Sequence, residues 1–486
     1  MPSNERLMIG QFWFANNPDL VVPGRLDLTG ERPRVELHGA LSSSVREVPS
    51  GVPGISQFVN APPPKPQTLY GEVLGIARRV TVIDAYQVHK TGDVLSTWSD
   101  GSSGGLQQQI LEGEYAILGV HAQDADVPFS ALHFRLCFQD AWAQLSGLSM
   151  AINPDPHNRT VSMNYAMPEP IVVPLPGGDG HLTLEAASAI SPLRVAGAYI
   201  LTRTYLKVEL DEGVTVRAAW ARFVLSASAL LTLLHDKACK PTEFEVQDVA
   251  SGKWYRVHMP GLVSDPSDVR SPKIDEPALL TRSELGLERL AAWFDLAHRL
   301  APLPYVVADA VQATGRAVES LLLELAAAAE GIHRRLYPGS RRLTEQETSE
   351  ALEALKELDL NPAAKEVLRS AMGTYLWDVS FPQRLRQLSE DVSSAMPGVT
   401  GKPGKWKSAV CDARNGFAHF LVSKESDEAK ILGYAALHKS LRWLLTGRIL
   451  LELGVPAELL AQRLAEFRKY NHFLMNAKES LPNIYG

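Results

Sequence analysis

Two hydrophobic periodicities divide the chain. In the first half, apolar residues alternate with polar ones, as where Leu132, Phe134 and Leu136 alternate with His133 and Arg135. A period of two places successive side chains on opposite faces of the backbone, which predicts a strand with one buried face. After about residue 280 the apolar residues follow a helical period instead, which predicts amphipathic helices. The pattern therefore predicts a β-rich first half followed by a helical second half.

Turn residues separate the predicted strands. Asp211–Gly213 follows a strand-like run and predicts a hairpin, and Ser251–Gly252 predicts a second hairpin between Phe244–Val246 and Trp254–Val257. Prolines and glycines recur at the spacing of a sandwich-like β domain. The apolar run Ala218–His235 is longer than a typical strand, so we expect a helix packed on the sheet.

The domain boundary is predicted from a segment rich in Asp, Ser and Pro between Gly261 and Pro277. We expect an α+β multidomain protein with a β-rich, sandwich-like domain at residues 1–265, a linker at 266–279 and an all-α bundle at 280–486. The expected helices are Thr281–Leu300, Val306–Tyr337, a helix opened by the capping-box pair Thr344 and Glu347 and running through Leu358, a helix from Pro362, Phe381–Met396, a helix after the Gly398–Gly404 loop, Leu432–Leu453 and Ala457–Phe473.

Charge limits the way in which this protein can bind nucleic acid. The 486 residues carry a formal net charge of −7, which excludes binding through overall positive charge. Residues 395–450 differ from the rest, because nine Lys and Arg residues stand against four acids and give a local charge of 9 − 4 = +5. Any RNA contact is therefore expected from this basic segment.

Other patterns argue against several classes of protein. Three widely spaced cysteines form no CxxC pair, so a disulfide framework is not expected. No signal-peptide pattern or membrane-spanning apolar run occurs, and we expect a cytoplasmic protein without a membrane partner. No HExxH, paired-cysteine or GxxxxGK[ST] motif occurs, so neither a metal nor another cofactor is expected.

The candidate chemistry lies in Arg414, Asn415 and His419. A guanidinium is a permanent cation that suits a phosphate, and an imidazole can move a proton near neutral pH. Arg414 and His419 are five residues apart, about 140° around a helix, so the long arginine stem, a distortion near Gly416 or a second chain must bring them together. Arg32 and His38 have a similar spacing but lie in a strand-like segment, and we interpret that pair as coincidental.

The surrounding segments resemble one family of helical proteins. Cys411–Phe420 (CDARNGFAHF) followed by the apolar helix that ends in Leu444–Pro456 (LLTGRILLELGVP) is similar to the HEPN ribonucleases and toxins. Leu321–Pro338 and Ser380–Glu390 resemble helices of the ApeA-type HEPN proteins, which are anti-phage abortive-infection effectors. Segments such as Gly71–Ala85 resemble the β-rich domain that precedes HEPN in those proteins.

The resemblance implies a function and partners. It implies a metal-independent endoribonuclease in which two HEPN domains of a homodimer, or of a higher homo-oligomer, line one cleft. Arg414, Asn415 and His419 are then the catalytic residues. RNA, with tRNA as the expected class, is the substrate, and the N-terminal domain senses a phage-derived trigger or restrains the nuclease.

Further residues are candidates for supporting roles. Asp412 is expected to orient Arg414 or to cap a helix. Glu330 and His333 lie together on a helix that is expected to face the motif, where His333 either supports catalysis or takes an interhelical or surface position. The candidates for RNA binding are Lys405, Trp406, Lys407 and Arg442. An exposed Trp406 would stack on an unpaired base, whereas a buried one would pack the preceding loop onto the bundle.

Two alternatives remain open from the sequence. A catalytically silent HEPN domain would serve only as a dimerisation or RNA-binding scaffold. A toxin restrained by a separate antitoxin would also carry this motif, although the large N-terminal domain offers restraint within the same chain.

Overall fold

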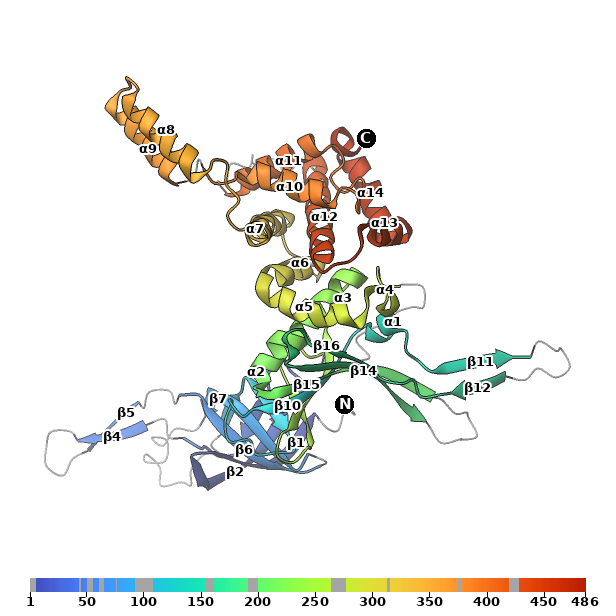
Figure 1. The fold of residues 1–486 in the computed structure, drawn as a ribbon. Coiled ribbons are helices and arrows are strands. Elements are labelled where there is room, and N and C mark those ends of the chain that lie inside the picture. The colour runs from blue at the N-terminus through green and yellow to red at the C-terminus, as the bar shows by residue number, and fades with distance from the viewer. Residues whose placement is uncertain are drawn as a thin grey trace. The chain divides into compact units, whose positions relative to one another are not determined.

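The computed structural model describes the chain in two compact units. The first comprises Met1–Ser228 and Cys239–Glu276, and the second comprises Ala229–Ala238 and Pro277–Gly486. The first is rich in strands and the second is helical (Figure 1), which confirms the predicted fold class. The described residues are 6–42, 45–49, 56–60, 65–75, 77–91, 108–153, 161–190, 200–263, 277–312, 315–374, 377–418 and 428–486.

Antiparallel strands make up most of the first unit. The large sheet has the order β13-β14-β15-β10-β16-β17-β9-β7-β6-β1-β2-β3-β8, and the pairs β4–β5 and β11–β12 form separate hairpins. The strands are β1 (Leu7–Phe14), β2 (Asn17–Asp27), β3 (Arg34–Leu37), β4 (Val45–Pro49), β5 (Ser56–Asn60), β6 (Gln67–Val73), β7 (Arg79–Thr91), β8 (Gln108–Glu112), β9 (Tyr115–Leu118), β10 (Phe129–Leu136), β11 (Leu148–Ile152), β12 (Val161–Tyr165), β13 (Ile171–Pro174), β14 (Gly180–Ile190), β15 (Ile200–Val214), β16 (Pro241–Asp248) and β17 (Trp254–His258).

Part of this sheet closes on itself. β7 pairs with β6 through its first half and with β8 through its second half, and β8 also pairs with β3. The strands β6-β1-β2-β3-β8-β7 therefore form a ring, in which each strand has a partner strand on both sides. Phe12, Leu26, Val35, Leu69 and Val82 fill its core and are almost fully buried. The sandwich-like arrangement expected from the sequence is thus corrected to a barrel-like ring continued by an extended sheet.

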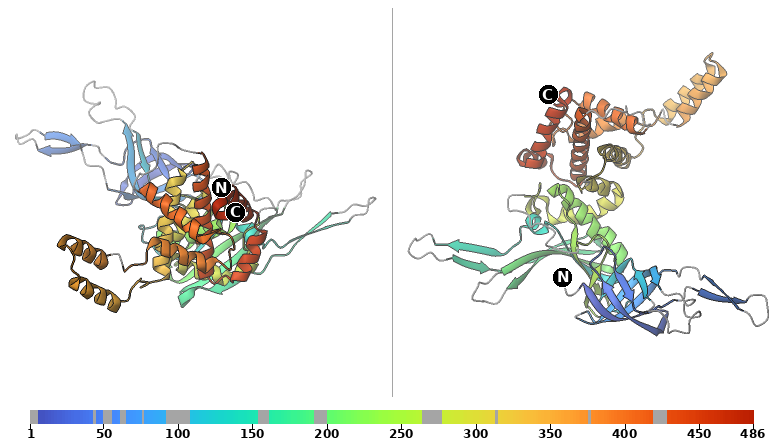
Figure 2. Two further views of the ribbon diagram at one scale, coloured as in Figure 1. Left: turned by 90° about the horizontal axis from the view of Figure 1, so that it is seen from above. Right: turned by 180° about the vertical axis from the view of Figure 1, so that it is seen from behind.

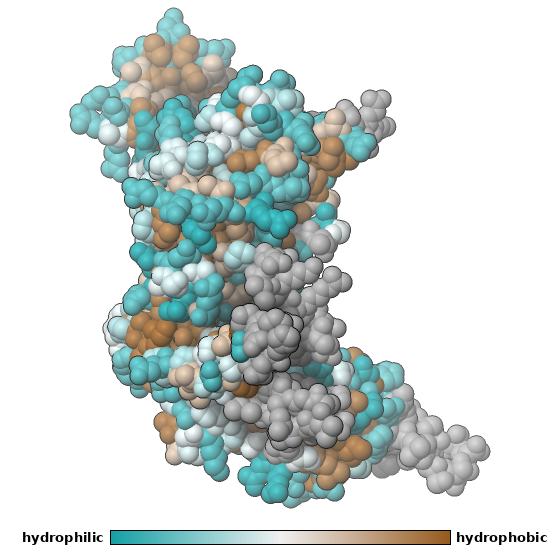
Figure 3. All heavy atoms as spheres, turned by 90° about the vertical axis from the view of Figure 1, so that its right-hand side faces the viewer, coloured by the Kyte–Doolittle hydropathy of each residue, from teal (hydrophilic) through white to brown (hydrophobic). Residues whose placement is uncertain are grey.

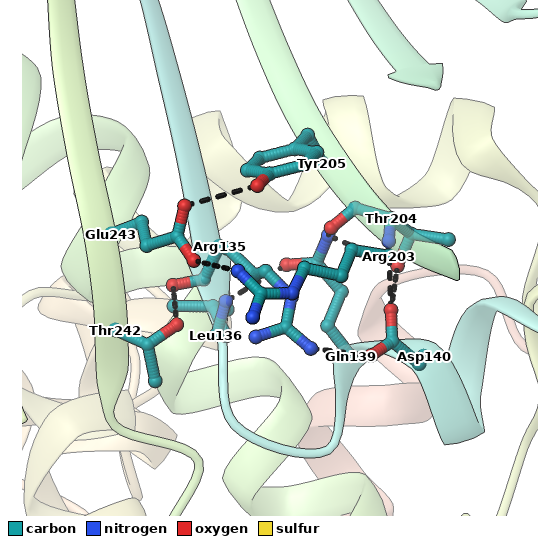
Figure 4. A network of polar contacts seen from close by, with 9 residues as sticks. All are labelled: Arg135, Leu136, Gln139, Asp140, Arg203, Thr204, Tyr205, Thr242 and Glu243. Atoms are coloured by element: carbon teal, nitrogen blue, oxygen red, sulfur yellow. Dashed lines mark hydrogen bonds and ion pairs between the residues drawn. The ribbon is translucent and has the colours of Figure 1, made fainter. Parts of the chain in front are cut away.

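The extended part of the sheet is tied to a short helix by a network of polar contacts (Figure 4). β10 ends at Leu136, and α1 (Gln139–Ala143) begins three residues later. The Gln139 side chain accepts from the Leu136 amide at 3.0 Å and donates to the Thr204 carbonyl at 2.9 Å. Asp140 accepts from both the amide and the hydroxyl of Thr204 at 2.8 Å. These bonds satisfy polar groups at the strand end and join β10 to β15.

One of the two predicted hairpins is confirmed. β16 and β17 pair across the turn that contains Ser251–Gly252, and Gly252 has a φ of 64°, which glycine adopts readily. The prediction of a hairpin at Asp211–Gly213 is wrong, because β15 runs as one strand from Ile200 to Val214. β15 pairs with β14 up to Leu210 and with β10 at Glu209 and again at Val214, so Asp211–Gly213 forms an irregularity within one strand.

The expected helix Ala218–His235 is present as α2 (Val216–Ala219), a π-helical turn η4 (Trp220–Leu225) and α3 (Ser226–His235). Among the described residues, Val216–His235 is the one helical run long and apolar enough to cross a membrane. Of its apolar window, 72% is buried, as in the core helix of a folded domain. Among the described residues of the first unit, η3 (Pro176–Gly178) is a further short helical segment.

The second unit is a helical bundle. Its described helices are α4 (Arg282–Leu285), α5 (Leu287–Leu300), α6 (Leu303–Gln312), α7 (Val318–Leu336), α8 (Glu345–Glu357), α9 (Pro362–Thr374), α10 (Phe381–Val392), α11 (Pro403–Ala418), α12 (Glu428–Glu452), α13 (Ala457–Glu466), α14 (Arg468–Ser480) and α15 (Pro482–Tyr485). Gly286, with a φ of 83°, divides the helix that was expected to be continuous from Thr281 to Leu300. The expected helices Val306–Tyr337 and Ala457–Phe473 are likewise each divided, whereas the Thr344 and Glu347 capping box is confirmed.

The core of the helical unit lies between α7, α10, α11 and α12 (Figure 2). Leu325, Leu388, Val410 and Leu441 contribute fully buried side chains, one from each of these helices. α8 and α9 pack on each other as a helical hairpin between α7 and α10 in the sequence (Figure 1). The four core helices thus fix the position of α11, which carries the candidate motif.

Some large apolar side chains stay exposed in the helical unit. They include Val367 and Leu368 on α9, and Ile431 and Leu432 at the beginning of α12. On the face of the molecule drawn in Figure 3, hydrophobic patches are separated by hydrophilic residues. Scattered exposure of this kind is common, whereas adjacent apolar residues beside a functional motif are candidates for a contact.

Candidate active site

Arg414 lies near the end of α11 and is held against two neighbouring helices. Its Nη2 atom donates to Oε2 of Glu330 on α7 at 3.4 Å, and its guanidinium carbon lies 4.8 Å from the ring centre of Phe381 on α10. The side chain is 35% exposed. Since a guanidinium has five N–H donors, and Glu330 is its one hydrogen-bond partner among the described residues, Arg414 can still bind an anion.

Glu330 is shared between two arginines. One carboxylate oxygen contacts Arg414, and the other accepts from Nη2 of Arg334 at 3.1 Å. Arg334 in turn donates to Asp378 at 2.8 Å. Glu330, predicted as a supporting residue, therefore contacts the motif arginine and joins it to a larger charged network on α7 and α10.

His333 is fully buried between α7 and α10. Nη1 of Arg384 lies 2.9 Å from Nδ1, and Nε2 lies 2.9 Å from the amide oxygen of Gln387. Because a guanidinium only donates, Nδ1 is the acceptor and Nε2 carries the proton. Burial lowers the pKa of His333, and the charge of Arg384 also opposes protonation. His333 therefore has the interhelical role rather than the catalytic supporting role.

Two further motif residues face solvent. Asn415 and Asp412 are both exposed on α11. Asp412 lies in the middle of α11, away from both helix ends. It lines a hollow of about 420 Å³ that Lys430 also lines. A residue in the middle of a helix cannot cap it, so the expected capping role of Asp412 is corrected. In the described part of the chain, the carboxylate that contacts Arg414 belongs to Glu330, so the expected orienting role of Asp412 is corrected as well. Asn415 is accessible to a ligand.

His419 lies outside the described residues. α11 and the described segment end together at Ala418. The expected convergence of His419 and Arg414 remains a prediction.

The four predicted RNA contacts separate into two groups. Lys405 is exposed and Lys407 is half-buried on the first turns of α11, so both ammonium groups can reach a ligand. Trp406 is fully buried, and Arg442 is 6% exposed and paired with Asp236 within the same unit. A buried indole cannot stack on an RNA base and a buried guanidinium cannot reach a phosphate, so the predicted RNA contacts of Trp406 and Arg442 are corrected.

Two family models match the chain. The model for ApeA N-terminal domain 1 matches residues 8–293, and the model for Apea-like HEPN matches residues 323–459. The chain belongs to the ApeA family. No curated protein and no solved structure gave a match.

The ApeA match assigns the two halves of the chain to a defence effector. HEPN domains are generally ribonucleases, and they typically dimerise and bind RNA. The Apea-like HEPN segment includes most of α7 and all of α10, α11 and α12, and therefore contains both Arg414 and Glu330. The ApeA N-terminal match continues to residue 293, past the first unit's end at Glu276 and into α5.

A buried histidine makes the stability of the ApeA HEPN domain depend on pH. Burial lowers the pKa of His438 to about 4, with Arg442 and Lys439 contributing. Its Nε2 atom has no hydrogen-bond partner among the described residues. Because the folded pKa lies below the unfolded value of about 6.5, the unfolded state binds the proton first, and stability falls as the pH drops through this interval.

The expected loss between pH 7 and pH 5 is about 2 kcal/mol from this residue, at about 1.4 kcal/mol per pH unit below 6.5. His438→Leu is expected to remove that part of the pH dependence. Urea unfolding of both proteins at the two pH values measures it. An equal loss of unfolding free energy in both proteins would show that His438 titrates normally in the folded state.

Proposed function

We propose that this ApeA family member is a metal-independent endoribonuclease of anti-phage defence. The observation that carries the proposal is the position of Arg414, which lies in the HEPN segment, is partly exposed and is oriented by Glu330 and Phe381. A fixed, accessible cation at this position suits a phosphate that gains negative charge during cleavage.

RNA carries its own nucleophile. The 2′-OH attacks the adjacent phosphorus, forming a P–O bond, and the bond to the 5′-oxygen of the next nucleotide breaks. His419 takes the proton from the 2′-OH or gives one to the leaving 5′-oxygen. Arg414 neutralises the added charge of the phosphorane, and Asn415 donates a hydrogen bond to a phosphate oxygen.

One histidine cannot easily supply both proton transfers at one phosphate. A homodimer with two motifs in one cleft provides a second imidazole. Ile431 and Leu432 support this arrangement, because they are exposed apolar residues at the beginning of α12, shortly after the motif. The exposed Lys405 on α11 gives the same domain a further contact for an RNA backbone.

The proposed substrate is a cytoplasmic tRNA, cut in its anticodon loop. Unpaired loop nucleotides can be splayed out and oriented for in-line attack, which a duplex prevents. The N-terminal domain is proposed to detect a phage-derived trigger and to restrain the nuclease in its absence.

Purified full-length protein is expected to cut RNA in the presence of excess EDTA. The 5′ fragment is expected to end in a 2′,3′-cyclic phosphate, because the 2′-OH itself attacks the phosphorus. Mapping of fragment ends on total cellular RNA measures reaction type and substrate class together. Fragments with a 3′-hydroxyl, or cleavage that EDTA abolishes, would contradict the proposed chemistry.

Two further results would favour the alternatives. A stable dimer that leaves a broad RNA panel intact, with or without the trigger, would identify a silent scaffold. Equal toxicity of the full chain and of its C-terminal half on expression would argue against restraint by the N-terminal domain and for a separate antitoxin.

A further inference from the structure

A hollow lined by arginines lies where the α8–α9 hairpin joins the helical bundle. Its volume is about 310 Å³, and its charged and aromatic lining consists of Arg334, Tyr337, Arg341, Trp377, Asp378 and Arg384. We call it the arginine pocket. The segments before α8 and after α9 form its walls. They are held together by a hydrogen bond of 2.7 Å from the Arg342 amide to the Trp377 carbonyl and by a β-bridge between Arg341 and Asp378.

The deepest cation of the arginine pocket is Arg384. Its side chain is only 3% exposed. Two of its nitrogens are bound by His333 and Asp378, at 2.9 Å and 2.7 Å, while Nε has no hydrogen-bond partner in the described part of the chain. Because its side chain is buried, Arg384 contributes positive charge to the pocket rather than a donor that a ligand can reach.

The other two arginines lie nearer the surface. The guanidinium of Arg341 stacks on the ring of Trp377, with 3.8 Å between the guanidinium carbon and the ring centre. Arg334 is about half exposed and donates to Asp378 and Glu330. Stacking fixes the plane of the Arg341 guanidinium and leaves its N–H edges directed away from the ring, which is the geometry that phosphate recognition uses.

The balance of charge in the pocket favours an anion. Three guanidinium groups and one carboxylate line it, which gives a formal charge of 3 − 1 = +2. Burial would raise the pKa of Asp378, but the adjacent Arg384 and Arg334 outweigh it and lower that pKa. The carboxylate therefore stays ionised and holds these two arginines side by side. Glu345 lies 3.6 Å from Arg341 but is 87% exposed, so it neutralises Arg341 only weakly.

We propose that the arginine pocket binds the phosphate of a nucleotide. Arg334 and Arg341 bind the phosphate oxygens, and the buried charge of Arg384 adds to the attraction. The Arg341–Trp377 stack offers a flat surface for the base or sugar. Glu330 connects the pocket to the motif, since its two oxygens contact Arg334 of the pocket and Arg414 of the candidate active site. The nucleotide belongs to an RNA strand that passes Arg414, an identification that rests on the proposed function, or it is free in solution.

Arg341→Ala tests the pocket, with Arg386→Ala as the matched control. Both arginines are on the surface of the same unit. Among the described residues, Arg341 pairs with Glu345 and Arg386 with Glu390, in each case four residues along the chain and at 3.6 Å. The probe is a fluorescent RNA with 2′-O-methyl groups, which cannot be cut because its 2′-oxygens carry no proton. Anisotropy titration of full-length protein then measures binding separately from cleavage.

Arg341→Ala is expected to weaken binding about fivefold or more, and to reduce the slope of log binding constant against log salt concentration by about 0.7. Arg386→Ala is expected to bind like the wild type, and both variants are expected to melt like the wild type. Calorimetry with AMP alone provides the second arm. If Arg341→Ala loses AMP binding but keeps RNA affinity, the ligand is a free nucleotide.

Binding of both probes by Arg341→Ala at wild-type strength would overturn the proposal that the arginine pocket binds a nucleotide. The same result in a protein that cuts RNA would leave the proposed nuclease function standing. Conversely, if the wild-type protein cuts no RNA but Arg341→Ala loses RNA binding, the result would support nucleotide binding by the arginine pocket and contradict the proposed nuclease function.

Discussion

Arg414→Ala is expected to reduce RNA cleavage at least 100-fold while the protein remains folded, and His419→Ala is expected to do the same. The first variant removes the cation proposed to stabilise the phosphorane, and the second removes the group proposed to transfer a proton. Each effect is worth about 10²–10⁴-fold in comparable sites. Arg414 is 35% exposed and contacts Glu330 at 3.4 Å, so its loss costs the bundle little stability. Cleavage rates of an end-labelled RNA under single-turnover conditions measure both effects.

Two further variants separate charge from geometry. Arg414→Lys keeps the positive charge but loses the planar fork of donors and the stacking on Phe381, so partial activity is expected. Lys405→Ala removes an exposed cation from the same helix and is expected to change the rate far less. Wild-type rates in both Arg414→Ala and His419→Ala would refute the assignment of the motif.

Trp406→Ala is expected to destabilise the helical unit by about 3–5 kcal/mol. Its side chain is fully buried, so the substitution removes a large apolar contact and leaves a cavity. Chemical unfolding followed by circular dichroism measures the change in the free energy of unfolding. Trp406→Phe is expected to lose less, because the indole N–H has no hydrogen-bond partner among the described residues.

Lys405→Ala is the control for this experiment. It alters the adjacent, exposed position of α11, and surface substitutions usually change stability by less than about 0.5 kcal/mol. If Trp406→Ala unfolds like Lys405→Ala but loses RNA affinity, then Trp406 is exposed in solution and stacks on bases.

The helical and β-rich halves were predictable because hydrophobic period is a local property. The capping box at Thr344 and the turn at Ser251–Gly252 depend on neighbouring residues, and both are present. Asp211–Gly213 shows the limit of such signals. These residues favour a turn, but β15 pairs with β10 again at Val214, so the chain continues as one irregular strand, and no local sequence signal reports that partner.

The candidate site was predictable in part for the same reason. Arg414 and Glu330 stand out through their position in recognisable helical segments, and the structure brings them into contact across 84 residues of sequence. The burial of Trp406 and Arg442 was not predictable, because each lies in a basic segment where exposure is equally compatible with the sequence. Arg384 and Asp378 were missed because single charged residues outside a motif give no signal until the fold assembles them.

The base of the α8–α9 hairpin has a consequence for how the domain tolerates change. The bond between Arg342 and Trp377 closes the chain where the hairpin leaves and re-enters the bundle. Residues between these two points form an appendage whose length is not constrained by the packing of α7, α10, α11 and α12. Insertions, deletions or fused tags at its tip would therefore alter what the domain presents to its surroundings and leave the four-helix core intact.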